Sequence, residues 1–270
     1  MKKYIFLDID GTLLDSKKQV SCENIKAMNE LKKDEFEIVF CSGRNNDYLI
    51  NLSKKTNTSN YIISSNGSMI YNQKENKIIH ADCIPFHILK NIYNYCKKNK
   101  LAITFNTDKY RYYNDFYHQE KKDIKIINNI NDINNIIVTQ FVVGSYNYQK
   151  MIEVKEYIDN IEELEIVNIS TTMKFKQINS KDGFFYDVVL KGINKGTGID
   201  SFIKYMNISK KDCIAIGDHI NDVDMFNATE YKIAMGNGYE ELKKQADYIA
   251  KTNDDNGVVD ALEHLQKKFL

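Results

Sequence analysis

Short apolar runs alternate with helix-like segments near both ends of the 270-residue chain, and each run stops at a polar loop. The runs cover residues 4–7, 36–41, 61–63, 213–216, 232–235 and 248–250. An uninterrupted apolar run of this length suits a strand that is buried on both faces. Strands that alternate with helices form a parallel sheet with right-handed crossovers. We therefore expect an α/β fold built on a Rossmann-like parallel sheet.

The alternation breaks down in the middle of the chain. Strand-like segments lie at 102–105, 111–113, 136–143, 166–169, 175–178 and 184–190, with helix-like segments at about 86–96 and 149–159. Strands and helices that follow one another without strict alternation are typical of α+β modules. We expect a discontinuous α/β core formed by residues 1–80 and 191–270, with an α+β cap domain inserted at 81–190.

The composition limits the classes of function. The 37 basic residues balance 37 acidic ones, with a pI near 6.9, which argues against a broadly basic nucleic-acid binder. No apolar run approaches the roughly 18 residues that span a bilayer, and Asp8 comes too early for a secretory signal. The five cysteines are scattered and form no CxxC pair, which suits reduced thiols. We expect a cytoplasmic protein with neither a nucleic-acid nor a membrane partner.

Acidic residues follow two of the predicted core strands. Asp8 and Asp10 come directly after the first strand, and Asp218 and Asp222 follow the strand at 213–216. Paired carboxylates repel one another unless a cation or a shared proton intervenes, and hard oxygen ligands suit Mg²⁺. The alternative is that these residues only form turns and cap helices. Their common position at the carboxyl ends of parallel strands favours a ligand site.

Donor groups follow the same pattern. Ser42 and Gly43 offer a hydroxyl and free backbone N–H groups at a helix start, which is a natural seat for phosphate oxygens. The alternative is an ordinary Ser-Gly turn, which is common before helices. Lys195 opens a predicted helix, where it is either a solvated lysine or a counter-charge for the acids and a phosphoryl group. Arg44 and Asn66 are expected at the same crevice, where they contact substrate, or where Arg44 simply pairs with an acid.

Four motifs stand in order along the chain: LDIDGTLL, CSGR, NKG and GDHINDVDMF, with SSNG and AMGNG as further loops. In these motifs the chain resembles the haloacid-dehalogenase (HAD) superfamily, in particular its Cof-like sugar-phosphatase branch with a large α/β cap. The resemblance covers essentially the whole chain and implies a core of HAD type. Ser42 stands where threonine is also common, and Gly238 where the branch often has alanine. Neither difference removes a catalytic group.

The resemblance also implies roles for individual residues. Asp8 would be the nucleophile that forms an aspartyl-phosphate, and Asp10 the general acid and then base. Mg²⁺ would be held by Asp8, the backbone carbonyl of Asp10, and Asp218. The residues that bind the transferring phosphoryl group would be Ser42, Gly43, Lys195 and Asn221. Asp222 would lie behind this first layer, as an outer metal partner or as the residue that orients the lysine.

These expectations combine into a cytoplasmic, Mg²⁺-dependent phosphatase for a small phosphorylated metabolite, by resemblance a sugar phosphate. Two alternatives stay open. In a phosphomutase or phosphotransferase of the same fold, a sugar hydroxyl would intercept the aspartyl-phosphate. In a receiver-like signalling module, phospho-Asp8 would persist, although such a module needs neither Asp10 nor a cap of about a hundred residues.

Overall fold

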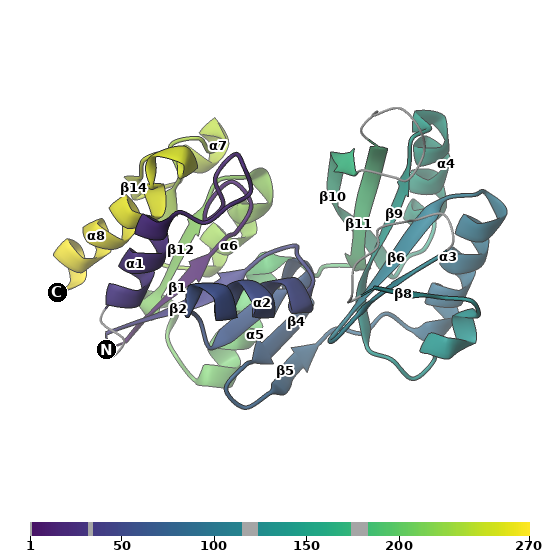
Figure 1. Ribbon diagram of the computed structural model, residues 1–270, viewed down its shortest axis with the longest axis horizontal. Helices are drawn as coiled ribbons and strands as arrows, with labels where there is room; N and C mark the ends of the chain where they lie inside the picture. The colour runs from purple at the N-terminus through teal and green to yellow at the C-terminus, as the bar shows by residue number, and fades with distance from the viewer. Residues whose placement is uncertain (1, 32–34, 115–123, 174–182) are drawn as a thin grey trace. The chain divides into compact units, whose positions relative to one another are not determined.

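The computed structural model describes residues 2–31, 35–114, 124–173 and 183–270 (Figure 1). The chain separates into two compact units. The first comprises Met1–Arg44, Tyr48–His80 and Asn194–Leu270, and the second comprises Asn45–Asp47 and Ala81–Ile193. The domain limits expected from the sequence stay predictions.

An eight-stranded sheet forms the centre of the first unit, in the order β14-β13-β12-β1-β2-β3-β4-β5. Its strands are β1 (Lys3–Leu7), β2 (Phe36–Cys41), β3 (Tyr61–Ser64), β4 (Met69–Asn72), β5 (Lys77–Ala81), β12 (Cys213–Gly217), β13 (Tyr231–Ala234) and β14 (Tyr248–Ile249). All pairs from β14 to β3 are parallel, and β4 runs antiparallel to β3. The predicted parallel α/β sheet is therefore confirmed.

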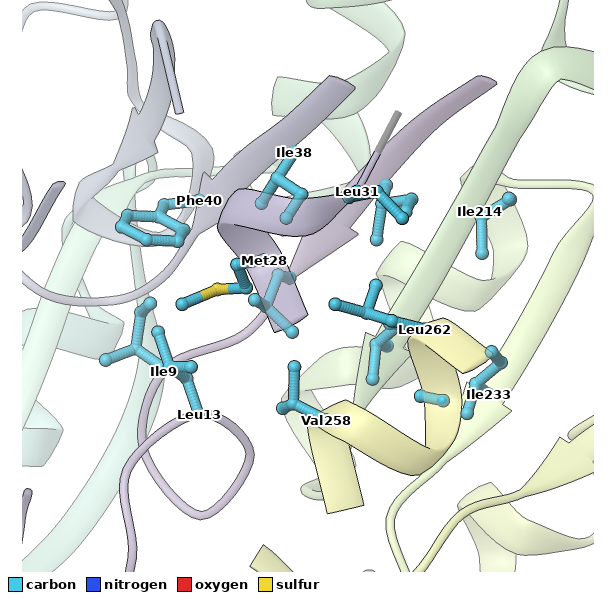
Figure 2. Packing of buried hydrophobic residues seen from close by; sticks show 14 of the residues in the cluster. Ile9, Leu13, Met28, Leu31, Ile38, Phe40, Ile214, Ile233, Val258 and Leu262 are labelled. Carbon is cyan, nitrogen blue, oxygen red and sulfur yellow. The ribbon is translucent and has the colours of Figure 1, made fainter. Parts of the chain in front are cut away.

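Helices cover both faces of this sheet. They are α1 (Cys22–Glu30), α2 (Asn46–Thr56), α5 (Lys195–Met206), α6 (Val223–Ala228), α7 (Glu240–Lys243) and α8 (Gly257–Phe269). Side chains of α1, of Leu31 directly after it and of α8 meet over one face, as Figure 2 shows for Met28, Leu31, Val258 and Leu262. Side chains of α5 and α6 pack on the other face.

Strand β1 shows why the apolar runs have no polar alternation. Ile5 and Leu7 belong to the hydrophobic cluster under α1 and α8, whereas Tyr4 and Phe6 belong to the cluster under α5 and α6. Both faces of the strand are therefore buried, and every position along it favours an apolar side chain.

The second unit contains a six-stranded sheet in the order β10-β11-β9-β6-β7-β8. Its elements are β6 (Ala102–Thr107), β7 (Arg111–Tyr113), β8 (Ile124–Ile126), β9 (Val138–Ser145), β10 (Leu164–Met173), β11 (Gly183–Leu190), α3 (Phe86–Lys98) and α4 (Tyr148–Asp159). All strand pairs except β7 with β8 are antiparallel. Both helices pack into one hydrophobic cluster with the sheet, which is the α+β arrangement predicted. The strand expected at 175–178 lies outside the described residues.

Two expectations from composition can be compared with the structure. In the described part of the chain, no helix combines the length and the apolar character needed to cross a membrane. All five cysteines are free thiols, three of them buried.

Candidate active site

The site is built at the carboxyl ends of two neighbouring strands. Asp8 directly follows β1, and Asp218 directly follows β12, with which β1 pairs in parallel. The Asp8 N–H donates to the carbonyl of Ile216 at 3.0 Å, which extends this pairing to the start of the loop. Carboxylate oxygens of Asp8, Asp218 and Asp222 lie within 4.8 Å of one another, and all three residues are buried.

Lys195 enters this group from the first position of α5. Its Nζ donates to Asp8 Oδ1 and to Asp222 Oδ1, both at 2.6 Å, and only 2% of the residue is exposed. The helix begins here because Asn194 and Thr197 form a reciprocal capping box. Burial lowers the pKa of a lysine, but the two carboxylates outweigh this effect and raise the pKa of Lys195. The side chain is therefore a buried ammonium group.

Asp222 has a second set of partners. Its Oδ2 accepts hydrogen bonds from the backbone N–H groups of Asp218, at 2.9 Å, and His219, at 3.0 Å. Gly217 has no room for a side chain, since a Cβ there would lie 2.6 Å from the same oxygen. One carboxylate thus shapes the loop after β12 and also orients Lys195.

Three buried carboxylates face one ammonium group. Burial raises the pKa of Asp8 well above its ordinary value, against the opposing effect of Lys195. Burial and the neighbouring Asp222 raise the pKa of Asp218 to about 6. These shifts arise because three ionised carboxylates would carry more negative charge than one ammonium group neutralises. Clustered carboxylate oxygens with surplus negative charge suit Mg²⁺, so the residues present fit a divalent cation.

Asp10 directs its carboxylate to a different partner. Arg44 donates to both carboxylate oxygens, at 2.7 and 2.6 Å, and Lys18 lies 3.3 Å from one of them. The guanidinium of Arg44 also lies over the ring of Tyr48, 4.6 Å from its centre. Burial alone would raise the pKa of Asp10, but its bonds to Arg44 and the charge of that residue lower it overall. Of the two interpretations of Arg44, the structure shows pairing with an acid.

The loops after β2 and β3 lie against each other. The Ser42 N–H donates to the carbonyl of Ile63 at 3.0 Å, and the Asn66 N–H donates to the carbonyl of Ser42 at 3.1 Å. The amide group of Asn66 occupies the space beside Gly43 in which a larger residue would place its Cβ. The side-chain oxygen of Asn221 is buried without a hydrogen-bond partner among the described residues.

The ten residues predicted for the site are all described, and all belong to the first unit. Eight of them lie in loops that directly follow strands of the central sheet. The other two are Lys195, at the start of α5, and Asp222, at the end of the turn before α6. The carboxylates of Asp8, Asp218 and Asp222 meet Lys195, whereas Asp10 is paired with Arg44. Their catalytic and binding roles stay proposals.

Three residues that support the site were not singled out from the sequence. Thr12 donates its hydroxyl to Asp218 Oδ1 at 2.9 Å. Asn237 donates its amide to the carbonyl of Gly11 at 2.8 Å, and its own oxygen accepts from the N–H of Asn253 at 2.9 Å. Thr12 lies in the LDIDGTLL motif and Asn237 in the AMGNG loop, so their position in these segments could have marked them as site residues. Asn253 lies in a polar segment that resembles many others in this chain.

Known proteins that are similar to this chain are named as hydrolases and phosphatases. A family model described as haloacid dehalogenase-like hydrolase matches residues 5–262. The chain is 26% identical to Phosphatase YwpJ of Bacillus subtilis (strain 168), over 97% of this chain and 99% of that protein. It is 28% identical to 5-amino-6-(5-phospho-D-ribitylamino)uracil phosphatase YcsE of the same organism, over 97% and 95%.

Solved structures show the same fold. A haloacid dehalogenase-like hydrolase from Bacteroides thetaiotaomicron superposes with a TM-score of 0.83 at 24% identity, covering 98% of this chain and 100% of the other. A haloacid dehalogenase-like hydrolase from B. subtilis superposes with a TM-score of 0.78 at 23% identity, covering 97% and 99%. At this level of identity the likeness concerns the fold.

Proposed function

Because the chain belongs to the haloacid dehalogenase-like hydrolases, as its four motifs predicted, we propose that it is a Mg²⁺-dependent phosphatase for a small phosphorylated metabolite. The observation that carries the proposal is the buried Lys195, held at 2.6 Å from both Asp8 and Asp222. Relatives named as phosphatases match nearly the whole chain. One of them is named for a substrate with its phosphate on a ribityl chain, which supports a sugar phosphate or a related compound.

The proposed metal ligands are Asp8, Asp218 and the backbone carbonyl of Asp10. Bound Mg²⁺ would let an anionic carboxylate approach an anionic phosphate and would neutralise charge on the phosphoryl oxygens. Thr12 would keep Asp218 in position through its 2.9 Å hydrogen bond. The surplus of buried negative charge supports this assignment.

In the proposed first step, a carboxylate oxygen of Asp8 attacks phosphorus. A bond forms between that oxygen and phosphorus while the bond from phosphorus to the leaving alkoxide breaks. Lys195 holds the Asp8 carboxylate in one orientation. Less conformational freedom of this carboxylate is therefore lost on reaching the transition state. Asp10 first takes up a proton and then gives it to the alkoxide. The oxygen that carries this proton has to leave Arg44, while the other oxygen stays bound and keeps the acid in position.

In the proposed second step, water attacks the aspartyl-phosphate. Asp10 accepts the proton of this water, the bond between Asp8 and phosphorus breaks, and inorganic phosphate leaves. Ser42, Gly43, Lys195 and Asn221 would hold the phosphoryl oxygens through both steps. The phosphoryl group would accept from the Asn221 amide nitrogen. The unpartnered amide oxygen is an acceptor and supports a cation or a hydrogen-bond donor near this residue.

The test is phosphate release from a panel of phosphorylated sugars, nucleotides and cofactors, with Mg²⁺ or with EDTA. We expect release that requires Mg²⁺ and that falls at least roughly 10³-fold in Asp8→Asn, about 4 kcal/mol of barrier. Asp200→Asn, an exposed position on α5, is the matched control and should keep wild-type turnover. Near wild-type turnover in a folded Asp8→Asn protein would contradict the nucleophile assignment. An isomerised ester without inorganic phosphate would contradict hydrolysis.

A further inference from the structure

The loop after β3 has an unusual backbone. Ser65 and Asn66 both have positive φ, at 52° and 55°, and Gly67 follows at 100°. Two consecutive non-glycine residues in the left-handed region are rare, and such conformations persist where the surrounding structure enforces them and where function uses them. Here the loop is fixed by hydrogen bonds from the N–H groups of Ser65 and Asn66 to the carbonyls of Arg44 and Ser42, at 2.9 and 3.1 Å.

This backbone places the amide of Asn66 against Gly43. A Cβ at Gly43 would lie 2.7 Å from Oδ1 and 3.1 Å from Nδ2 of Asn66. Only 3% of Asn66 is exposed, and its Nδ2 has no hydrogen-bond partner among the described residues. A buried amide donor without a partner is costly, and it calls for a bound ligand or water.

The neighbours of this amide are donors as well. The N–H of Gly43 has no partner in the described part of the chain. The hydroxyl oxygen of Ser42 accepts from the Arg44 N–H at 3.2 Å, which leaves its proton available for donation. Donors that neighbour one another in this way suit the oxygens of an anion.

We infer that Asn66 is a ligand-binding residue, whose Nδ2 donates to an oxygen of the phosphoryl group that Ser42 and Gly43 are proposed to bind. The inference rests on the proposed function, because that function supplies the anion. It assigns a role to the SSNG loop: the strained turn aims an amide donor at the phosphate seat.

A purely structural role makes a different prediction. If Asn66 only fills the space beside Gly43 and tolerates a left-handed backbone, aspartate should replace it with little loss, because aspartate has the same shape and a similar tolerance. If Nδ2 donates to an anion, aspartate replaces a donor with a negative charge, and anion binding should fail. Asn66→Gly keeps the backbone conformation and removes the donor without adding charge.

The experiment measures binding of inorganic phosphate, in the presence of MgCl₂, by calorimetry and by protection against thermal unfolding. We expect Asn66→Asp and Asn66→Gly to weaken phosphate binding by about 10-fold or more, the loss of one hydrogen bond to a charged group. The control is Asn207→Asp, the same substitution at another left-handed asparagine, which is exposed at the end of α5. It should bind phosphate like the wild type.

The outcomes separate the two proposals. Wild-type affinity in both Asn66 variants, with an active wild-type enzyme, would overturn the role of Asn66 and leave the proposed function intact. A wild-type protein that neither hydrolyses any ester of the panel nor binds phosphate would overturn both. If Asn66→Asp does not fold, Asn66→Gly decides by the same criterion.

Discussion

Lys195 carries a full positive charge in a buried position because two carboxylates lie 2.6 Å from its Nζ. Removing the lysine leaves like charges buried together, whereas removing one carboxylate leaves a paired lysine. We expect Lys195→Met to lower the free energy of unfolding by about 3 kcal/mol or more, and Asp8→Asn to lower it far less or to raise it. Chemical denaturation of both variants, beside the exposed-site control Lys204→Met, measures this. Equal destabilisation by both substitutions would show that the carboxylates do not share one cation.

Arg44 is one of only two arginines among the 37 basic residues of the chain. Its planar fork grips both oxygens of Asp10, which the point charge of a lysine does not reproduce. We expect Arg44→Lys to lower kcat by about 10-fold, the equivalent of one lost charged hydrogen bond, with a smaller change in KM. Steady-state kinetics check this. A change confined to KM would mean that Arg44 serves substrate binding and does not position Asp10.

Single residues of the site differ in how far the sequence predicts them. Asp8, Asp10, Ser42, Lys195 and Asp218 stand in motifs whose spacing fixes them to strand ends and a helix start. Pairings are harder to predict, because the sequence does not say which of several nearby carboxylates a cation approaches. Arg44 therefore had two interpretations, and only the three-dimensional structure shows that it binds Asp10. The hydrogen bond of Thr12 to Asp218 joins residues 206 positions apart, and no local pattern reports it.

The turn after β3 packs closely against the start of α5. A Cβ at Gly67 would lie 1.9 Å from the Asn194 carbonyl oxygen, and the φ of 100° is unfavourable for any other residue. We expect Gly67→Ala to lower the free energy of unfolding by at least about 2 kcal/mol and to reduce activity, because α5 carries Lys195. Gly192→Ala is the matched control: φ is 79°, but the space is open. A similar loss in both variants would assign the effect to backbone strain alone.

Helix α8 packs a histidine against the edge of the sheet. The ring of His264 stacks on Tyr248, with centres 3.8 Å apart, and its Nε2 lies 2.8 Å from the hydroxyl of Tyr231. Burial lowers the pKa of His264, and Lys268 lowers it further. The charged groups that act on this ring are Lys268, Asp260 and Lys267, and Asp260 has the opposite, raising effect.

This environment makes stability depend on pH. Because the folded pKa of His264 is below the unfolded value of about 6.5, the unfolded state binds more protons as the pH falls through this range. The contribution is therefore complete above about pH 6.5 and is lost as the pH falls through the folded pKa. We expect His264→Phe to unfold with a weaker pH dependence between about pH 7.5 and 5 than the wild type. If the free energy of unfolding changed equally with pH in the two proteins, the assignment to His264 would be contradicted.

Helices and strands could be predicted from the sequence where burial determines the pattern of apolar residues. Strands β1, β2 and β12 are buried on both faces and read as apolar runs, and the helix expected at 149–159 is α4 at Tyr148–Asp159. Strands β4 and β5 were not predicted. Their segments, Met69–Asn72 and Lys77–Ala81, include polar and exposed residues. Strand β4 forms because it pairs with β3 in antiparallel orientation. The residues of a strand do not reveal locally which partner it will pair with.

For the molecule as a whole, a divalent cation bound by the buried carboxylates would couple folding to metal binding. A divalent cation that binds only the folded chain stabilises it by about 2.7 kcal/mol at 100 times its Kd. We expect Mg²⁺ to raise the thermal midpoint of the wild type, and EDTA to reverse the effect. The Asp218→Asn variant should respond less, since it lacks one proposed ligand. NaCl at matched ionic strength is the control, and an equal shift with NaCl would reduce the effect to general screening.

The first unit joins segments that are far apart in the chain: β1 pairs with β12, and Lys195 reaches Asp8 across 187 positions. Synthesis on the ribosome proceeds from the N-terminus. A growing chain therefore presents Asp8 and Asp10 long before Lys195 and Asp218 emerge. Until then β1 lacks one of its two neighbours, and the acidic loop lacks its ammonium group. The proposed catalytic arrangement can form only after most of the polypeptide has been made, so a half-finished chain would lack the proposed activity.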